Sequence, residues 1–183
     1  MKEREPTSLE YALLGLLHQQ PQSGYDLRKV FETTALGNYS GSPGAIYPAL
    51  KRLEGRGLIE GEVDSTTELR PRKLFRPTGK GRKLFRDWLS RELDRQDVER
   101  RLDEVMLRFA FHGVLGSGAA TRRFLASLLA EVEAYVEELR AQRRLIPEGT
   151  PLHPRLALAA GIEQYRACAR WARGAIKRFE EES

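Results

Sequence analysis

The chain has 183 residues, of which 40% are hydrophobic, and its formal net charge is +5. This apolar content suffices for the core of one generous domain or two small ones, whereas so mild a net charge identifies no partner. No stretch approaches the roughly 18 uninterrupted apolar residues of a membrane span, and the charged N-terminus MKEREPTSLE lacks the apolar core of a signal peptide. We therefore expect a globular, cytoplasmic protein that does not bind membranes.

Residues suited to metal binding or catalysis are scarce in this sequence. Cys168 is the only cysteine, which excludes an intrachain disulfide or a thiolate metal cage. His18, His112 and His153 are dispersed without the spacing of metal ligands. The chain also lacks a glycine-rich phosphate loop, a nucleophile elbow and an identifiable pair of catalytic carboxylates. We therefore expect no metal, no cofactor and no enzymatic activity.

Two short helices are predicted near the N-terminus. Thr7 and Glu10 form a capping-box pattern ahead of an apolar stripe, which predicts the first helix. Ser23 and Asp26 repeat the pattern ahead of a second, shorter helix. Residues 35–41 then contain two glycines and an asparagine, which indicates the turn before a third helix.

The third predicted helix carries a polar face that a core does not need. Ser42 is a suitable cap, Pro48 indicates that the helix starts close to it, and Ile46, Leu50 and Leu53 fall on one face. The opposite face is left with Tyr47, Lys51 and Arg52. Such a face suits a polyanion better than an apolar interior.

A two-stranded hairpin is predicted directly after this helix. Gly55 and Gly57 end the helix, and residues 58–64 alternate between apolar and polar as a half-buried strand does. Residues 65–67 supply a turn, and residues 71–77 form a return strand that Pro71 confines to a sheet edge. Three helices followed by a hairpin predict a winged helix-turn-helix.

The distribution of charge supports the same interpretation. Residues 70–86 contain eight basic residues and no acidic one, although the whole chain is only mildly basic. A basic segment beside a helix of this kind is typical of contact with a phosphate backbone. Two alternatives remain open at this point, a solvated basic face and a winged-helix adaptor that binds another protein without a DNA target.

Four ordered blocks spread over about half of the chain carry a family resemblance: SLEYALLGLL, SGYDL, SPGAIYPALKRLEGRGLI and RPRKLFRPTGKGRKL. Together they resemble the PadR-like transcriptional regulators. The resemblance implies a winged-helix DNA-binding domain followed by helices that dimerise, with repression relieved by a small, often aromatic, effector. We therefore expect a sequence-specific repressor whose partners are operator DNA, a second copy of the chain and a small-molecule effector.

The candidate DNA contacts lie on the third helix and the wing. Ser42 offers its hydroxyl and the helix N-terminal amides to a phosphate, and Lys51 has no apolar partner to satisfy. Tyr47 has an alternative role, in which its ring packs on the second helix and only its hydroxyl faces outward. The full set of candidates is Ser42, Tyr47, Lys51, Arg52, Arg72 and Lys73, of which the last two match the PRK block of the family.

The remaining chain is predicted to be helical. A helix leads out of the wing after Thr78, and the hydrophilic residues 94–103 are predicted to bridge rather than to pack. The expected fold is therefore mainly α with a small β-hairpin. It comprises a winged-helix DNA-binding domain with a connecting helix, residues 1–95, and a C-terminal helical dimerisation domain, residues 96–183.

Two apolar stripes at heptad spacing occur in the C-terminal half, and each requires a partner helix. An antiparallel pair within one subunit would satisfy both stripes. The last helix carries a second apolar line through Ala160, Cys168, Trp171 and Ala175, which favours a dimer because one neighbour rarely covers so much apolar surface. The expected dimer interface comprises Leu158, Ile162, Tyr165, Ala169, Ala172, Ile176 and Phe179. Trp88 and Trp171 are the candidate effector contacts, although most aromatic residues on apolar stripes are core residues.

Overall fold

The computed structural model describes residues 4–40, 42–64, 72–115 and 118–182. The chain folds as two compact units, Met1–Ser90 and Arg91–Ser183. None of the helices within the described residues has both the length and the apolarity that a membrane span requires.

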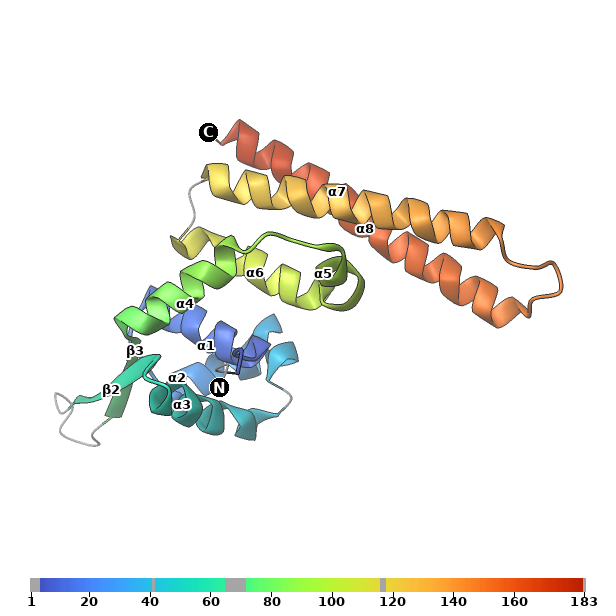
Figure 1. The fold of residues 1–183 in the computed structure, drawn as a ribbon. Helices are drawn as coiled ribbons and strands as arrows, with labels where there is room; N and C mark the ends of the chain where they lie inside the picture. Colours follow the sequence, from blue (N-terminus) through green and yellow to red (C-terminus); the bar gives the residue numbers. More distant parts are fainter. Residues whose placement is uncertain (1–3, 41, 65–71, 116–117, 183) are drawn as a thin grey trace. The chain divides into compact units, whose positions relative to one another are not determined.

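The first unit combines short helices with a small sheet (Figure 1). Its helices are α1 (Ser8–Gln19), α2 (Gly24–Thr33), the 3₁₀ helices η1 (Ala35–Tyr39) and η2 (Pro43–Ala45), α3 (Ile46–Gly55) and α4 (Gly79–Ser90). Its strands are β1 (Gln22–Ser23), β2 (Ile59–Asp64) and β3 (Arg72–Pro77). The strands pair antiparallel in the order β1-β3-β2, which completes the predicted winged helix-turn-helix.

Both predicted capping boxes are confirmed. The backbone N–H of Glu10 donates to the Thr7 hydroxyl at 3.3 Å, and the backbone N–H of Thr7 donates back to the Glu10 carboxylate at 3.0 Å. Ser23 and Asp26 make the same reciprocal pair at the start of α2. Each box satisfies two backbone donors that have no partner inside the helix, so local sequence alone fixes where α1 and α2 begin.

The start of α3 differs from its prediction. Ser42 precedes the 3₁₀ turn η2 and makes no capping hydrogen bond with its side chain, so the predicted cap is wrong. The α-helix begins only at Ile46, which makes Pro48 its third residue. The N–H that Pro48 lacks therefore belongs to the first turn, where no intrahelical acceptor exists, and the proline costs the helix little.

The wing strands are paired over their whole described length. In the register, Ile59 lies opposite Pro77, Gly61 opposite Phe75, and Val63 opposite Lys73. The predicted turn at residues 65–67 and the edge residue Pro71 lie outside the described residues. Strand β1 was not predicted, because two residues are too few to show an alternating pattern.

Helix α4 is held against α1 by aromatic packing. The rings of Tyr11 and Trp88 stack with centroids 4.2 Å apart and planes 7° apart, and Phe85 is fully buried beside Trp88. The other end of α4 reaches the wing, where Gly81 lies against the backbone carbonyl of Leu58. A Cβ atom at position 81 would overlap that carbonyl oxygen, so the close approach of α4 to the wing requires glycine.

We expect Gly81→Ala to lower the free energy of unfolding by about 1–3 kcal/mol, because the new methyl group must displace backbone. Gly79→Ala is the matched control, since an added Cβ there meets nothing within 4 Å. That control is expected to be neutral or slightly stabilising, as alanine is the better helix former. Urea unfolding of both variants provides the test, and equal stability for the two would contradict the close contact.

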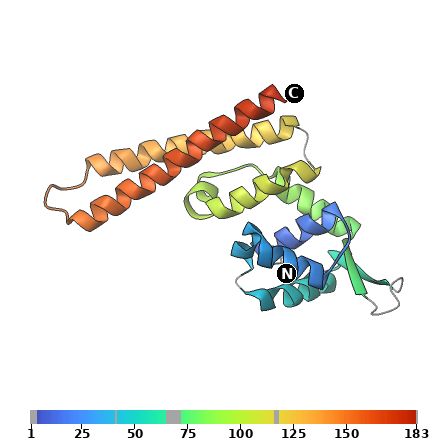
Figure 2. The same cartoon turned by 180° about the vertical axis from the view of Figure 1, so that it is seen from behind.

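The second unit consists of four described helices. They are α5 (Arg95–Arg100), α6 (Leu102–Leu115), α7 (Gly118–Arg144) and α8 (Leu152–Glu181). Figure 1 and Figure 2 show α7 and α8 running antiparallel, side by side, as one long hairpin.

Residues 94–103 do not bridge as predicted, because they form a helix that packs. Asp94 caps α5 through a third capping box with Asp97, and Val98 is fully buried. The Asp97 side chain is 2% exposed, and its carboxylate forms ion pairs with Arg91 at 3.0 Å and Arg101 at 2.7 Å. Val98, the partly buried Leu102 and one satisfied carboxylate thus hold a mainly hydrophilic segment against the rest of the second unit.

The hairpin helices bury much of the predicted dimer interface within one chain. Ala169 joins the buried cluster that includes Leu128 and Val132 of α7, and Ile162 packs with Leu139. Ile162, Ala169 and Ala172 are 3%, 4% and 0% exposed in the single chain. The intramolecular pair of helices therefore accounts for these three residues, and their side chains have almost no surface left for a second subunit.

Candidate nucleic-acid interface

Helix α3 places its apolar and polar residues on opposite sides. Ile46, Leu50 and Leu53 are buried against the rest of the first unit, whereas Lys51 is exposed. Lys51 has no ion-pair partner among the described residues. A lysine held outward on a rigid helix, with no carboxylate to neutralise it, is available to a phosphate or a base edge.

Tyr47 packs against α2 and is also exposed to solvent. Its ring lies against the start of α2, since a Cβ atom added at Gly24 would come within 2.7 Å of Tyr47 Cε1. The residue is nevertheless 52% exposed. The packing against Gly24 fixes the ring, and the exposed part of the side chain faces solvent beside Lys51.

Arg52, a predicted DNA contact, forms an ion pair within the first unit. Its Nε donates to Glu10 Oε1 at 2.7 Å, and Arg56 adds a longer contact of 3.8 Å to the same carboxylate. The Glu10 side chain is only 4% exposed, so it depends on these partners for its charge. Arg52 therefore joins α3 to α1, and its guanidinium is already engaged.

The basic segment, residues 70–86, is partly neutralised by carboxylates that precede it in sequence. Lys73 Nζ lies 2.7 Å from Glu54, and Arg76 Nε lies 2.9 Å from Glu60 on the neighbouring strand. Arg72 is exposed and has no such partner among the described residues, while Arg70 lies outside them. Of the wing candidates, Arg72 is therefore the cation best placed to contact a phosphate.

Helix α2 adds two exposed residues that sequence reasoning missed. Tyr25 is 66% exposed, and Arg28 is exposed on the same helix. The pKa of Arg28 is raised, chiefly by its hydrogen bond to Glu32 and the charge of that carboxylate, with smaller contributions from Tyr47 and Tyr25. Arg28 thus lies near both tyrosines. The signal in the sequence was the aromatic residue in SGYDL, which lies off the buried line of α2.

The two effector candidates lie in different environments. Trp88 is 3% exposed and stacked on Tyr11, so in this conformation it is a core residue of the first unit. Trp171 belongs to α8 in the second unit and is 37% exposed. Of the two rings, Trp171 is the one that a small molecule can contact without unfolding the core.

The described residues contain no group of three or more His, Cys, Asp or Glu side chains that could hold a metal ion.

Comparison with known proteins identifies the family. The family model described as "Transcriptional regulator PadR-like family" matches residues 13–87, which contain α3 and the wing, and "Virulence activator alpha C-term" matches residues 89–180. The chain belongs to the PadR-like family of transcriptional regulators. This assignment agrees with the expectation that the chain is not an enzyme.

Two curated transcriptional regulators match this chain, one over nearly its whole length and one over a short segment. The "Negative transcriptional regulator PadR" of Bacillus subtilis (strain 168) is 25% identical over 181 residues, covering 95% of this chain and 98% of that protein. The "Transcriptional regulator YqjI" of Escherichia coli (strain K12) is 41% identical over 51 residues, covering 28% of this chain and 25% of that protein.

Two solved structures match this chain at similar sequence identity and coverage. Bacillus subtilis PadR in complex with operator DNA is 26% identical, with 93% of this chain and 98% of that chain covered and a TM-score of 0.44. The PadR-like regulator BC1756 from Bacillus cereus is 27% identical, with 96% and 99% covered and a TM-score of 0.42.

Substitution of the neighbouring residues Lys51 and Arg52 is expected to separate DNA binding from stability. Lys51→Ala removes an unpaired exposed cation, so we expect DNA affinity to fall about tenfold with stability unchanged. Arg52→Ala deprives a buried carboxylate of its main partner, so we expect the free energy of unfolding to fall by about 1–3 kcal/mol. Fluorescence anisotropy with labelled DNA and urea unfolding measure the two effects. A stable Arg52→Ala protein that has lost DNA affinity would instead place Arg52 in the interface.

Proposed function

We propose that this PadR-like regulator is a homodimeric repressor that binds two-fold operator DNA and is released by a small aromatic effector. The observation that carries the proposal is the outward face of α3, where Lys51 and Tyr47 lie exposed and no carboxylate of the described residues pairs with the lysine. In this proposal α3 enters the major groove and Arg72 of the wing meets the backbone or the minor groove. Ser42 and the N-terminal amides of η2 contact a phosphate.

The structural role of Arg52 sharpens this proposal. Because the Glu10 carboxylate draws Arg52 toward α1, the side chains that remain for base contacts are Tyr47 and Lys51, with Tyr25 of α2 as a further exposed aromatic residue. Arg28 of α2 pairs with Glu32 at 2.6 Å and is assigned a secondary role. Lys73 is held by Glu54 and is assigned a secondary role. The proposed interface thus has fewer cations than the sequence suggests, but each is held on a regular element.

Repression and dimerisation are proposed on different grounds. The relative from Bacillus subtilis that aligns over 95% of this chain is named a negative transcriptional regulator, which supports repression. Dimerisation is assigned to residues 96–183 and DNA binding to residues 1–95. The support for dimerisation is that α8 keeps large apolar side chains exposed although it already packs along α7. A dimer would also present two reading helices to a palindromic site.

The effector is proposed to be a small aromatic molecule, the class that the family resemblance implies. Trp171 is the residue assigned to it, because its ring is exposed and Trp88 is buried. An aromatic ligand that stacks on Trp171 would quench its emission, while the stacked Trp88 would be unaffected.

Binding to DNA from the region upstream of the gene that encodes this chain is expected to weaken steeply as the salt concentration rises, because phosphate contacts release counterions. In a dimer, Arg72→Ala removes two contacts and is expected to flatten the slope of log K against log salt by about two units. Lys73→Ala is expected to flatten it less, since Glu54 competes with phosphate for that lysine. Gel shifts over a salt series make the measurement. If the wild-type protein shifts no upstream fragment at any salt concentration, DNA binding is excluded and the adaptor interpretation takes its place.

A further inference from the structure

Arginine side chains of α7 and α8 line a groove on the helical hairpin. The groove has a volume of about 530 Å³, and the buried residues Val136 and Ala169 form its floor. Its charged lining residues are Glu133, Glu137 and Arg140 of α7 and Arg166, Arg170 and Arg173 of α8. Four guanidinium groups accompany two carboxylates there, so the lining carries an excess of positive charge.

The sequence brings these arginines to one place. Arg166, Arg170 and Arg173 are spaced by four and three residues, so they lie along one face of α8. The charged lining residues of α7 have the same spacing, and the two helices lie side by side as an antiparallel pair (Figure 1). Both charged faces therefore border the same groove.

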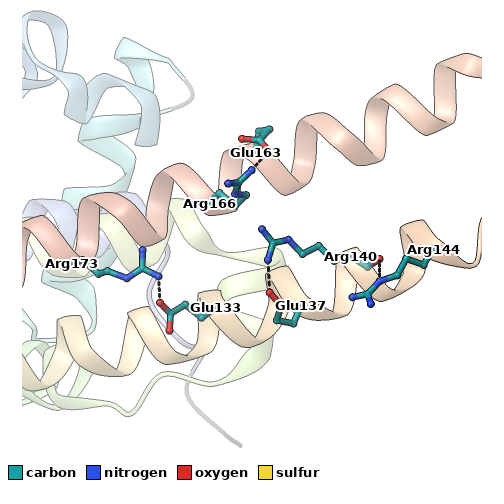
Figure 3. A network of polar contacts seen from close by, with 7 residues as sticks. All are labelled: Glu133, Glu137, Arg140, Arg144, Glu163, Arg166 and Arg173. Carbon is teal, nitrogen blue, oxygen red and sulfur yellow. Dashed lines mark hydrogen bonds and ion pairs between the residues drawn. The ribbon is translucent and has the colours of Figure 1, made fainter.

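Most of these arginines already have a carboxylate partner. The pairs are Arg173–Glu133, Arg140–Glu137 at 2.5 Å and Arg166–Glu163 at 2.6 Å (Figure 3). All six side chains are between 41% and 63% exposed. Ion pairs between exposed side chains contribute little to stability, because water and salt screen them. An anionic ligand can therefore replace a glutamate as the partner of an arginine and leave the hairpin folded.

Arg170 differs from its neighbours because it has no ion-pair partner within the described residues. It is exposed, and it lies one turn from both Arg166 and Arg173 on α8. Like charges at this spacing repel one another and destabilise a helix. The groove therefore contains an unneutralised cation and a local repulsion between arginines, and a bound anion would relieve both.

The carboxylates around the groove favour a compact ligand over a nucleic acid. Glu133, Glu137 and Glu163 each lie beside an arginine of the groove (Figure 3). A nucleic-acid backbone that followed the groove would bring successive phosphates close to these carboxylates, whereas a compact anion contacts the arginines alone.

We infer that this groove binds a small polyanion, a molecule with two or more phosphate or carboxylate groups, through Arg170 together with Arg140 and Arg173. Guanidinium groups suit such a ligand because they donate two parallel hydrogen bonds to phosphate or carboxylate oxygens. The described residues that line the groove include no aromatic side chain, so the site differs from the exposed ring of Trp171. The polyanion is therefore a second ligand, distinct from the proposed aromatic effector, and it links α7 to α8.

Chemical modification of arginines in the full chain tests the site. Phenylglyoxal reacts with exposed guanidinium groups, and mass spectrometry of the digested protein reports each arginine separately. Inorganic pyrophosphate at about ten times its dissociation constant, compared with sodium chloride at equal ionic strength, is expected to slow the modification of Arg170 about tenfold. Arg155 is the reference, because it is exposed on the same helix and does not line the groove, and its rate is expected to stay unchanged.

Two variants that remove the same charge test the role of Arg170. In Arg170→Gln, the pyrophosphate concentration that half-protects Arg173 is expected to rise about tenfold, because a charge-assisted hydrogen-bonding partner is lost. In Arg155→Gln, that concentration is expected to equal the wild-type value. Circular dichroism checks that both variants keep the helix content of the wild type.

Citrate in place of pyrophosphate separates the two ligand chemistries. Protection of Arg170 by pyrophosphate alone assigns the groove to phosphate compounds, protection by citrate alone assigns it to polycarboxylates, and protection by both supports a site for either group. Protection by neither anion, equal protection of Arg155 and Arg170, or an unchanged half-protecting concentration in Arg170→Gln would overturn the inference. Protection of Arg170 by operator DNA but by neither small anion would overturn it in favour of a nucleic-acid surface.

Discussion

The arrangement of the first unit, to which DNA binding is assigned in our proposal, depends on one buried carboxylate. Glu10 completes the capping box that starts α1 and, through Arg52 and Arg56, ties α3 to that helix. A carboxylate this deeply buried is tolerated only because backbone and guanidinium donors satisfy it, and removal of one partner from such a pair is costly. The same contact engages the Arg52 guanidinium, although its side chain stays 48% exposed, and it leaves Lys51 and Tyr47 as the exposed side chains of α3 that our proposal assigns to DNA. One long-range ion pair therefore contributes both to the position of α3 and to the choice of side chains that the helix leaves unpaired.

The second unit also contains a buried capping-box carboxylate that is paired with two arginines. Asp97 is the third helical residue of a capping box, is almost completely buried, and is held by Arg91 and Arg101. In both units, then, a carboxylate in the first turn of a helix also forms ion pairs with two arginines. In the first unit this use of arginine engages Arg52 and Arg56, whereas Lys51 and Arg72 have no carboxylate partner among the described residues.

The features that were predictable from sequence are those encoded locally. The capping boxes of α1 and α2, the apolar stripes of α1 and α3, and the position of β2 depend on neighbours a few positions apart, and they appear as expected, although Val63 of β2 is 62% exposed. The pairing of Arg52 with Glu10 spans 42 positions, so in sequence Arg52 looks like any other outward cation. The heptad stripe of α8 was equally ambiguous, since periodicity states that Ile162 and Ala169 need a partner but not whether that partner is α7 or a second chain. The packing decides this point for those two residues.

The central claim is that the outward face of α3, with Lys51 at its centre, contacts DNA. Acetylation of lysines in the full chain, with and without upstream operator DNA, and mass spectrometry of the products measure this directly. Lys177 on α8, which is 76% exposed, serves as the internal reference. The account predicts that DNA protects Lys51 from acetylation while the reactivity of Lys177 is unchanged. Equal reactivity of Lys51 in free and DNA-bound protein would contradict it.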